Sequence, residues 1–256
     1  MIIMIKSTDI EEFFDELAVD RDEKIREDAI VDYEQRLRQF FIKELLSIES
    51  NNTILDAGSG DCRDARVFLN GVKNLPGRYI ALDLSRKMLF EGVKKKQPRF
   101  IHLLQGDLTS IPLGEGTVDK IICSEVLEHI PDWGGALREL FRVLKNEGEI
   151  IISTPNKFSV YYPQKSVLES KDKSSHPYDE WKSYWILKTK LREIGFKIIS
   201  TRGSGFLPGL IAYRGIVRKI FEKRLNIIER FETNAIGRSP IRYFGYIIII
   251  KAIKKR

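Results

Sequence analysis

Short apolar runs alternate with amphipathic stretches through the middle of the chain. The runs cover residues 53–55, 79–82, 100–104, 120–124 and 149–153. Short apolar runs of this kind are typical of strands buried on both faces. The stretches at 62–69, 86–95 and 135–144 have helical character, so the alternation predicts right-handed βαβ crossovers and a doubly wound, mostly parallel sheet. Ligands of such sheets bind at the carboxyl ends of the strands.

The flanking parts follow different patterns. Residues 8–48 contain no Gly or Pro and place apolar side chains at intervals of three and four, which predicts helix. Beyond Pro155 the alternation stops, and residues 156–178 are interpreted as a mobile connection or lid. A helix is predicted over 179–194, with Gly195 as its C-cap.

Two further strands are predicted at 196–201 and 243–250, with an insertion at 203–242 between them. Residues 210–231 of this insertion have an amphipathic helix pattern. Its apolar face would carry Tyr213, Val217, Ile220, Phe221, Leu225, Ile228 and Phe231. The predicted organisation is a helical cap at 1–50, a core at 51–202 and 243–256, and a cap insertion at 203–242.

Charge and cysteine content narrow the setting. The chain has a net charge of +7, but residues 214–256 alone hold twelve Lys and Arg against three Glu, a net of +9. The basicity is therefore a local element rather than a whole-surface footprint for nucleic acid. Cys62 and Cys123 lie far apart, which argues against a disulfide framework and a zinc site and favours a reducing, cytoplasmic setting. The start of the chain is too short for a signal-peptide core, and residues 247–250 fall far short of the ~20 needed for a membrane span.

The first strand runs into Asp56-Ala57-Gly58-Ser59-Gly60. A glycine turn lets the backbone approach a ligand closely. A dinucleotide-binding turn would have a third glycine where this chain has Arg63. The acid at Asp56 would also repel a phosphate, so a cofactor with a positive charge and no phosphate fits better.

Three acids follow three successive strands: Asp56, Asp83 and Asp107. A carboxylate in the place of Asp83 can accept both hydroxyls of a ribose. Asp107 could accept an adenine amino hydrogen, with Leu84 and Leu108 packed on the ring. The alternative is that each Asp caps a helix or a turn, but three in register beside a glycine turn favour a nucleoside site.

At this point the chain resembles the class I S-adenosylmethionine-dependent methyltransferases, in particular the type 11-like branch that methylates small molecules or lipids. The matching pieces are residues 54–60, 81–85, 105–108, 111–113, 118–129, 140–145 and 148–155. The resemblance implies a Rossmann-like sheet of seven strands with an antiparallel last strand, S-adenosyl-L-methionine as cofactor, and no metal. Cys62 stands where the family often has a third glycine, but Gly58 and Gly60 keep the turn.

The resemblance also implies site residues. The turn with Asp56, Ala57, Gly58 and Gly60 would hold the methionine part of the cofactor, Asp83 the ribose, and Asp107 with Leu84 and Leu108 the adenine. Ser124 and Glu125 would flank the sulfonium. Tyr33 with Arg36 or Arg38 would close over the cofactor from the N-terminal cap, the arginine pairing with its carboxylate. An ordinary solvated helix face is the alternative for these three residues.

A general base is needed only if the methyl acceptor must lose a proton. His129 follows the fourth strand, and His176 lies in the predicted lid, where related enzymes often place a histidine close to the acceptor. Both are candidates, because the ordinary pKa of histidine is ~6.5. His102 is interpreted as structural.

The acceptor is the least readable part of the sequence. A small-molecule or lipid-like acceptor is expected, and the basic, apolar C-terminal segment allows a peripheral membrane contact. An anionic small molecule held by Arg214 or Arg218 is a second interpretation, and a cap helix with solvated cations is a third. Nucleic acid methylation is less favoured, since no stacking aromatics alternate with the basic residues. An inactive cofactor-binding or regulatory protein also stays open, whereas Asp56 speaks against a dehydrogenase.

Overall fold

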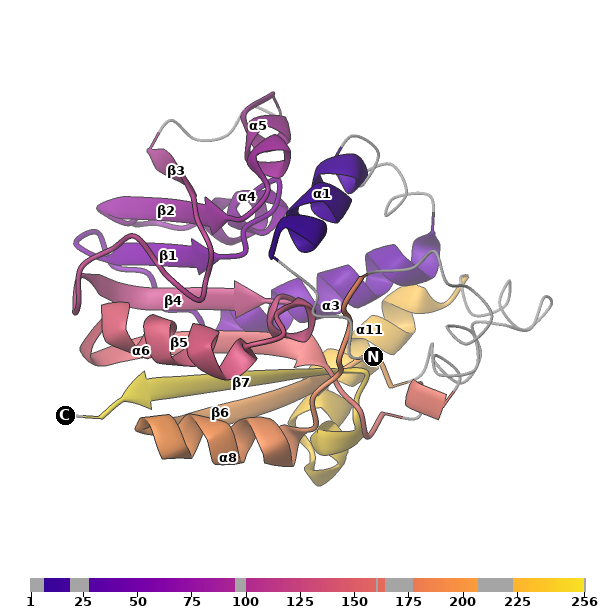
Figure 1. Cartoon of the computed structure of the whole chain (residues 1–256). Helices are drawn as coiled ribbons and strands as arrows, with labels where there is room; N and C mark the ends of the chain where they lie inside the picture. Colours follow the sequence, from indigo (N-terminus) through magenta and orange to yellow (C-terminus); the bar gives the residue numbers. More distant parts are fainter. Residues whose placement is uncertain are drawn as a thin grey trace, which may run out of the picture.

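The centre of the molecule is a seven-stranded sheet with helices packed on both faces (Figure 1). The computed structural model describes residues 7–18, 28–94, 100–159, 161–163, 177–206 and 223–255. The strands are β1 Thr53–Ala57, β2 Arg78–Asp83, β3 Ile101–Gln105, β4 Val118–Ser124, β5 Leu144–Pro155, β6 Phe196–Ser204 and β7 Ile247–Lys254. Their order is β3-β2-β1-β4-β5-β7-β6. Strands β1 to β5 pair in parallel, and β7 runs antiparallel to both β5 and β6. This confirms the predicted fold class.

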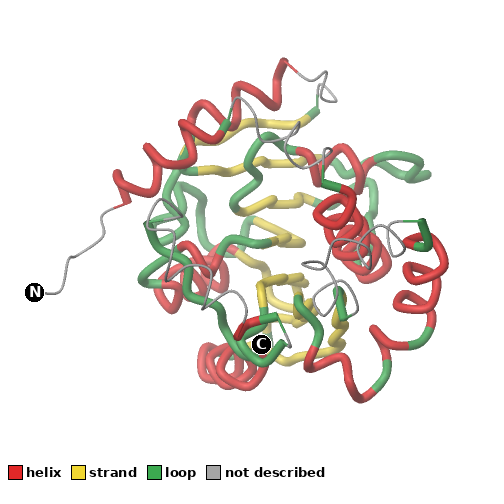
Figure 2. Tube along the Cα trace, turned by 90° about the vertical axis from the view of Figure 1, so that its right-hand side faces the viewer, coloured by secondary structure: helices red, strands yellow, loops and turns green. Residues whose placement is uncertain are grey.

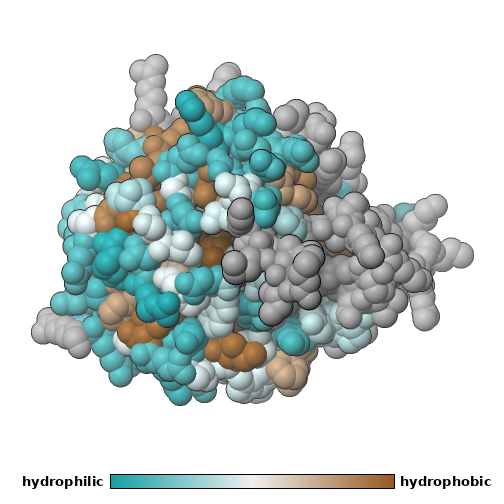
Figure 3. Space-filling view, in the orientation of Figure 1, coloured by the Kyte–Doolittle hydropathy of each residue, from teal (hydrophilic) through white to brown (hydrophobic). Residues whose placement is uncertain are grey.

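Helices sandwich the sheet, as the turned view shows (Figure 2). They are α1 Ser7–Leu17, α3 Ala29–Leu45, α4 Arg63–Leu69, α5 Arg86–Lys94, α6 Trp133–Val143, α8 Tyr184–Ile194 and α11 Leu225–Asn234, with the short 3-10 helices η1 Leu127–His129, η2 Ile236–Arg238 and η3 Pro240–Phe244. Side chains of α3 and α4 pack in one apolar layer, and those of α6 and α8 pack in the other. The outer surface seen in the orientation of Figure 1 is mainly hydrophilic, with separate apolar patches (Figure 3).

The isoleucine run of β7 joins the two layers. Ile247 and Ile249 pack in the layer that contains Phe41 of α3, whereas Ile248 and Ile250 pack in the layer on the α6 and α8 side. Successive strand residues point to opposite faces. The run is apolar throughout because both faces of this strand are covered.

Several predicted boundaries are corrected. β7 begins at Ile247 rather than at residue 243, because Pro240 starts η3. α8 begins at Tyr184 rather than at residue 179, because the Ser183 side chain accepts the Ile186 N–H as an N-cap. Gly195 ends α8 in the left-handed region, as predicted.

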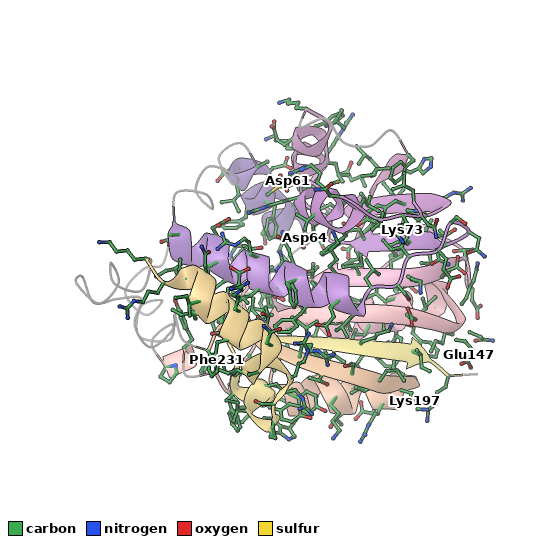
Figure 4. All side chains as sticks on the ribbon, turned by 180° about the vertical axis from the view of Figure 1, so that it is seen from behind. Asp61, Asp64, Lys73, Glu147, Lys197 and Phe231 are labelled. Atoms are coloured by element: carbon green, nitrogen blue, oxygen red, sulfur yellow. The ribbon has the colours of Figure 1, made fainter. Side chains whose placement is uncertain are left out.

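The predicted helical region 8–48 contains two described helices, α1 and α3, and α3 begins after the N-cap Asp28. Residues 19–27 between them, residues 164–176 of the predicted lid and residues 207–222 of the insertion lie outside the described residues. In α11, Leu225 and Ile228 share a face, as predicted, and the structure shows that this face packs on α3. Phe231 is 57% exposed and does not share that face (Figure 4). None of the described helices is long and apolar enough to cross a membrane.

Candidate functional site

A glycine turn follows β1 and folds against the end of β2. The N–H groups of Gly58 and Ser59 both donate to the Leu82 carbonyl, at 2.8 and 2.9 Å. Gly58 has φ +77°, and a Cβ added there would lie 2.4 Å from Cγ2 of Val126. The turn therefore needs glycine for its backbone conformation and for its close packing.

The Asp83 carboxylate stands at the end of β2, beside this turn. Its Oδ2 accepts the Gly60 N–H at 2.7 Å, and its Oδ1 accepts the Ser85 N–H at 2.9 Å. Asp107, after β3, likewise accepts the Thr109 N–H at 2.8 Å. Both acids thus act as turn caps, which was the alternative interpretation. Because the caps fix the carboxylates beside the cavity, capping and ligand binding are compatible at both residues.

One cavity of about 360 Å³ runs along the carboxyl ends of the strands. Of the predicted site residues, it is lined by Gly58, Gly60, Asp83, Leu84, Asp107, Leu108, Ser124, Glu125 and His129. Residues from β2 and β4 and from the loops after β1 and β3 therefore meet at one surface, as expected for a parallel sheet.

Helix α1 covers the β2 and β3 side of this cavity, within the region 1–50 predicted as a cap over the cofactor, through residues that the sequence did not single out. Ser7 Oγ donates to Asp107 Oδ2 at 2.9 Å, and Ile10 lines the cavity. The Phe14 ring stands edge-on to the His129 ring, with centroids 5.5 Å apart. The amphipathic pattern of residues 7–17 indicated a buried face, but gave no partner for it.

The buried cation at the cavity is Arg38 of α3, which is 4% exposed. It pairs with Asp64 at 2.8 Å and donates to Ser124 Oγ. Arg36 instead pairs with Asp32 and Glu229 and does not line the cavity. Two helical positions turn the side chain by about 200°, so the two arginines point to opposite sides of α3. Of the two arginines predicted to meet the cofactor, Arg38 lines the cavity and Arg36 does not.

Three other predicted contacts are also absent from the cavity lining: Tyr33, Asp56 and Ala57. Tyr33 is fully buried between α3 and α11, against Leu225. The Asp56 carboxylate accepts the Tyr79 hydroxyl at 2.8 Å inside the sheet, where burial, with a further contribution from Asp64, raises its pKa to about 7. Ala57 is part of the apolar layer. Their positions indicate structural support for the turn rather than ligand contact.

Glu125 and its neighbours form the other end of the cavity. Glu125 adopts φ +57°, a left-handed conformation that is uncommon outside glycine, and its N–H donates to the Ser153 carbonyl at 3.0 Å. Its Oε1 accepts from Ser153 Oγ at 3.2 Å. Burial raises the pKa of Glu125 to about 7, although Arg38 opposes the shift. Glu125 is therefore a proton acceptor that titrates near neutral pH.

His129 lies beside Glu125 on η1. Its Nδ1 is 3.3 Å from the Tyr178 carbonyl oxygen, and its Nε2 is 3.9 Å from Glu128 Oε1. Glu128 is 1% exposed, and burial followed by the Glu125 charge raises its pKa well above the ordinary value. The second predicted histidine, His176, lies outside the described residues.

Comparison with known proteins agrees with this geometry. A family described as "Methyltransferase domain" matches residues 55–152. A probable S-adenosylmethionine-dependent methyltransferase of Mycolicibacterium smegmatis is 30% identical over 41% of this chain and 39% of its own length. A ubiquinone biosynthesis O-methyltransferase of Hydrogenovibrio crunogenus is 27% identical over 70% of this chain and 75% of its own. The chain is thus similar to S-adenosylmethionine-dependent methyltransferases, and the family match covers residues 55–152.

A solved methyltransferase of Thermotoga maritima shares the fold, with a TM-score of 0.67 at 16% identity over 95% of this chain and 99% of that one. The cofactor of this family, S-adenosylmethionine, fits the hydrogen-bonding groups that line the cavity. Asp83 and Asp107 offer acceptors for hydroxyl and amino groups. Arg38 Nε is buried and has no hydrogen-bond partner among the described residues, so it can serve a carboxylate. Among all the residues that the structure describes, no group of three or more His, Cys, Asp or Glu is arranged to hold a metal ion.

Proposed function

We propose that this protein transfers the methyl group of S-adenosylmethionine to a small-molecule acceptor. The observation that carries the proposal is the order of groups along one cavity. The glycine turn, Asp83 and Asp107 stand at the ends of three neighbouring strands, and Glu125 with His129 stands at the fourth. This order suits an adenosyl group at one end and a reacting centre at the other.

Each part of the cofactor has a candidate partner. The Asp83 carboxylate would accept the ribose hydroxyls, and Asp107 with Leu108 would hold the adenine. The turn from Gly58 to Gly60 would follow the methionine part, and Arg38 would pair with its carboxylate. When bound, S-adenosylmethionine supplies an electrophilic methyl group on a sulfonium.

The chain's own contribution is orientation and exclusion of water. Fixing an acceptor beside Glu125 can supply part of the ~7–11 kcal/mol available from well-placed reactants. Helix α1 covers the site through Ser7, Ile10 and Phe14. His129, and His176 from the predicted lid, would act as general bases where the acceptor has to lose a proton.

The relative named for ubiquinone biosynthesis supports a small-molecule acceptor. A lipid-like acceptor and a peripheral membrane contact also stay proposals. In the described C-terminal part, the cations mostly serve the fold: Lys254 donates to the Phe141 and Leu144 carbonyls, and Arg238 pairs with Glu44. Support for the membrane contact therefore rests on the basic residues before Lys223. The cytoplasmic location stays a prediction.

Isothermal titration with S-adenosylmethionine and S-adenosylhomocysteine tests the proposed function. Both should bind the wild type, and Asp83→Ala should lose about 100-fold in affinity because a charge-assisted, partly buried contact is removed. Glu115→Ala, in the exposed loop that leads into the amino end of β4, is the control and should bind normally. Absence of binding to the wild type would overturn the proposal. Binding without transfer of labelled methyl to a metabolite and lipid extract would support an inactive binding protein.

A further inference from the structure

A second group of side chains extends from Glu125 toward β5 and β7, beyond the lining of the cofactor cavity. We call it the acidic–aromatic cluster: Glu34, Glu125, Glu128, Tyr161, Trp181 and Tyr246. Its rings form a continuous set. The ring centroids of Tyr161 and Tyr246 are 5.0 Å apart, and those of Trp181 and Tyr246 are 5.4 Å apart. Three separate chain segments supply these rings, so only the fold brings them together.

The carboxyl groups of this cluster lie close enough to act on one another. Burial, then the Glu34 charge, then the Glu125 charge raise the pKa of the Tyr246 hydroxyl. The strongest charge acting on Glu34 is Glu125, which with burial raises the Glu34 pKa to about 8. Glu125 likewise raises the pKa of Glu128. Tyr246 therefore stands among three acids.

Two of these carboxyl groups have an oxygen without a partner. Glu34 is 8% exposed and Glu128 is 1% exposed, and in each the buried Oε1 has no hydrogen-bond partner among the described residues. For Glu128, the neighbour at that oxygen is His129, at 3.9 Å. A buried polar atom without a partner costs about 1–3 kcal/mol, so its retention calls for an explanation.

The cations nearby are committed elsewhere. Arg38 pairs with Asp64, and Lys182 pairs with Glu180 at 2.6 Å. The charge of Arg38 acts on Glu125 and Glu128, and Arg38 is already paired with a fourth acid, Asp64. A ligand with a positive charge would remove the mutual repulsion, and the aromatic rings would add cation–π attraction.

We infer that the acidic–aromatic cluster binds the ammonium group of an amine, and that the methyl acceptor is such an amine. The inference rests on the proposed methyl transfer and adds its acceptor class. An inorganic cation would bind the carboxylate oxygens but would gain little from the aromatic rings. Metal ions such as Mg²⁺ prefer oxygen or nitrogen ligands to the carbon face of a ring.

The same acids can prepare an amine for reaction. A protonated amine has no free electron pair, so it must first lose a proton. That proton passes from the nitrogen to a carboxylate of the cluster, leaving a neutral amine and a neutral carboxylic acid. Glu125, whose pKa is raised to about 7, is partly ionised at neutral pH and can accept this proton.

Choline and its neutral isostere 3,3-dimethylbutan-1-ol test the inference, because they differ only in the charge of the head group. Each is titrated by calorimetry into the full chain saturated with S-adenosylhomocysteine, in buffer with EDTA. Choline should bind and the alcohol should bind at least about tenfold more weakly, because only the cation meets charge and ring attraction. Equal binding, or no binding of choline, would overturn the inference.

Glu34→Gln is the main variant, because it keeps the side-chain shape and Glu34 does not line the cofactor cavity. It should weaken choline about tenfold and leave S-adenosylhomocysteine affinity unchanged. Glu193→Gln, on an exposed part of α8, is the matched control and should change neither. Unchanged choline affinity in Glu34→Gln would remove the cluster from this role.

Magnesium chloride added without EDTA separates the two kinds of cation. If Mg²⁺ binds and displaces choline, the site takes an inorganic ion and the amine inference fails. If choline binds as well in the presence of Mg²⁺, the inference is supported. Failure of S-adenosylhomocysteine to bind the wild type would instead overturn the proposed function itself, so the two failures are distinguishable.

Discussion

The two halves of the site are built on opposite principles. Around the ends of β1, β2 and β3, the carboxylates of Asp83 and Asp107 are held by main-chain N–H groups of their own turns. Around the ends of β4, β5 and β7, Glu34 and Glu128 each keep a buried oxygen without a partner. The first half is fully organised before any ligand arrives. The second half holds buried acids whose pKa values are raised by burial and by one another, so their protonation depends on what binds there.

Gly58→Ala should have the largest effect, because it strikes the organised half at its tightest point. The added Cβ would meet Val126 at 2.4 Å in a backbone with φ +77°. We expect a loss of about 2–4 kcal/mol in the free energy of unfolding, measured by urea denaturation, and loss of cofactor binding. Gly58→Ala combined with Val126→Ala should recover part of the stability. A fully stable single variant would contradict the close packing.

Glu34→Gln should have the next largest effect, on the other half and with the opposite sign. The folded-state pKa of Glu34 is about 8, against 4.5 for the free group. Because the folded protein binds this proton more tightly, the wild type loses stability as pH rises from about 4.5 to about 8. The variant should therefore gain on the wild type over this window, reaching about 2–4 kcal/mol at about pH 8.

Urea denaturation at several pH values measures this gain, with Glu44→Gln on the same helix as the control. The groups that act on Glu34 are Glu125, Glu232 and Asp28, so the pH dependence belongs to this set. If the free energy of unfolding changes with pH in the same way in wild type and Glu34→Gln, the second half of the site is not under electrostatic strain.

The two arginines of α3 give a sharper comparison within one helix. Arg38→Met should weaken S-adenosylhomocysteine binding about tenfold, because a buried charge-assisted contact to the ligand carboxylate is lost. Arg36→Met should change it less than about twofold, because Arg36 is partly exposed and pairs with Asp32 and Glu229. Calorimetry measures both. A reversed order would favour Arg36, the other predicted arginine, as the partner of the ligand carboxylate.

Phe14→Ala should have the smallest effect. The ring contacts His129 from α1, so its removal loosens the cover of the cavity without touching the carboxylates. We expect cofactor dissociation to quicken about two- to fivefold in stopped-flow measurements, since about 0.5–1.5 kcal/mol belongs to such ring contacts. Phe90→Ala, an exposed phenylalanine of α5, should leave the rate unchanged.

The difference between the halves also explains what could be predicted from the sequence. The strands and the acids Asp83 and Asp107 were predictable, because each acid directly follows an apolar run and parallel strands end at a common edge. The choice between Arg36 and Arg38 depends on which face of α3 meets the sheet, and the local pattern does not set this. Asp56 was expected at the ligand because the local pattern does not show its true partner. That partner is the Tyr79 hydroxyl, which comes from the neighbouring strand.

The second half of the site, around the ends of β4, β5 and β7, was not predictable for a further reason. Glu34, Tyr161, Trp181 and Tyr246 come from four separate segments, and none of them belongs to a local motif. Glu125 and Glu128 were visible in the fourth-strand motif, but their charge balance depends on Arg38 from a different helix. Only the packed fold shows that these acids share one cation.

The position of β7 between β5 and β6 has a consequence for the order of folding. Among the described strands, β6 pairs with β7 and has no other neighbour, although β6 precedes β7 in the chain. During synthesis, β6 therefore has to wait for β7 before it can join the sheet. Until then, β5 is an open edge that another chain could occupy. The isoleucine run of β7 closes this edge on both faces at once, so the protein is most open to aggregation just before that run emerges.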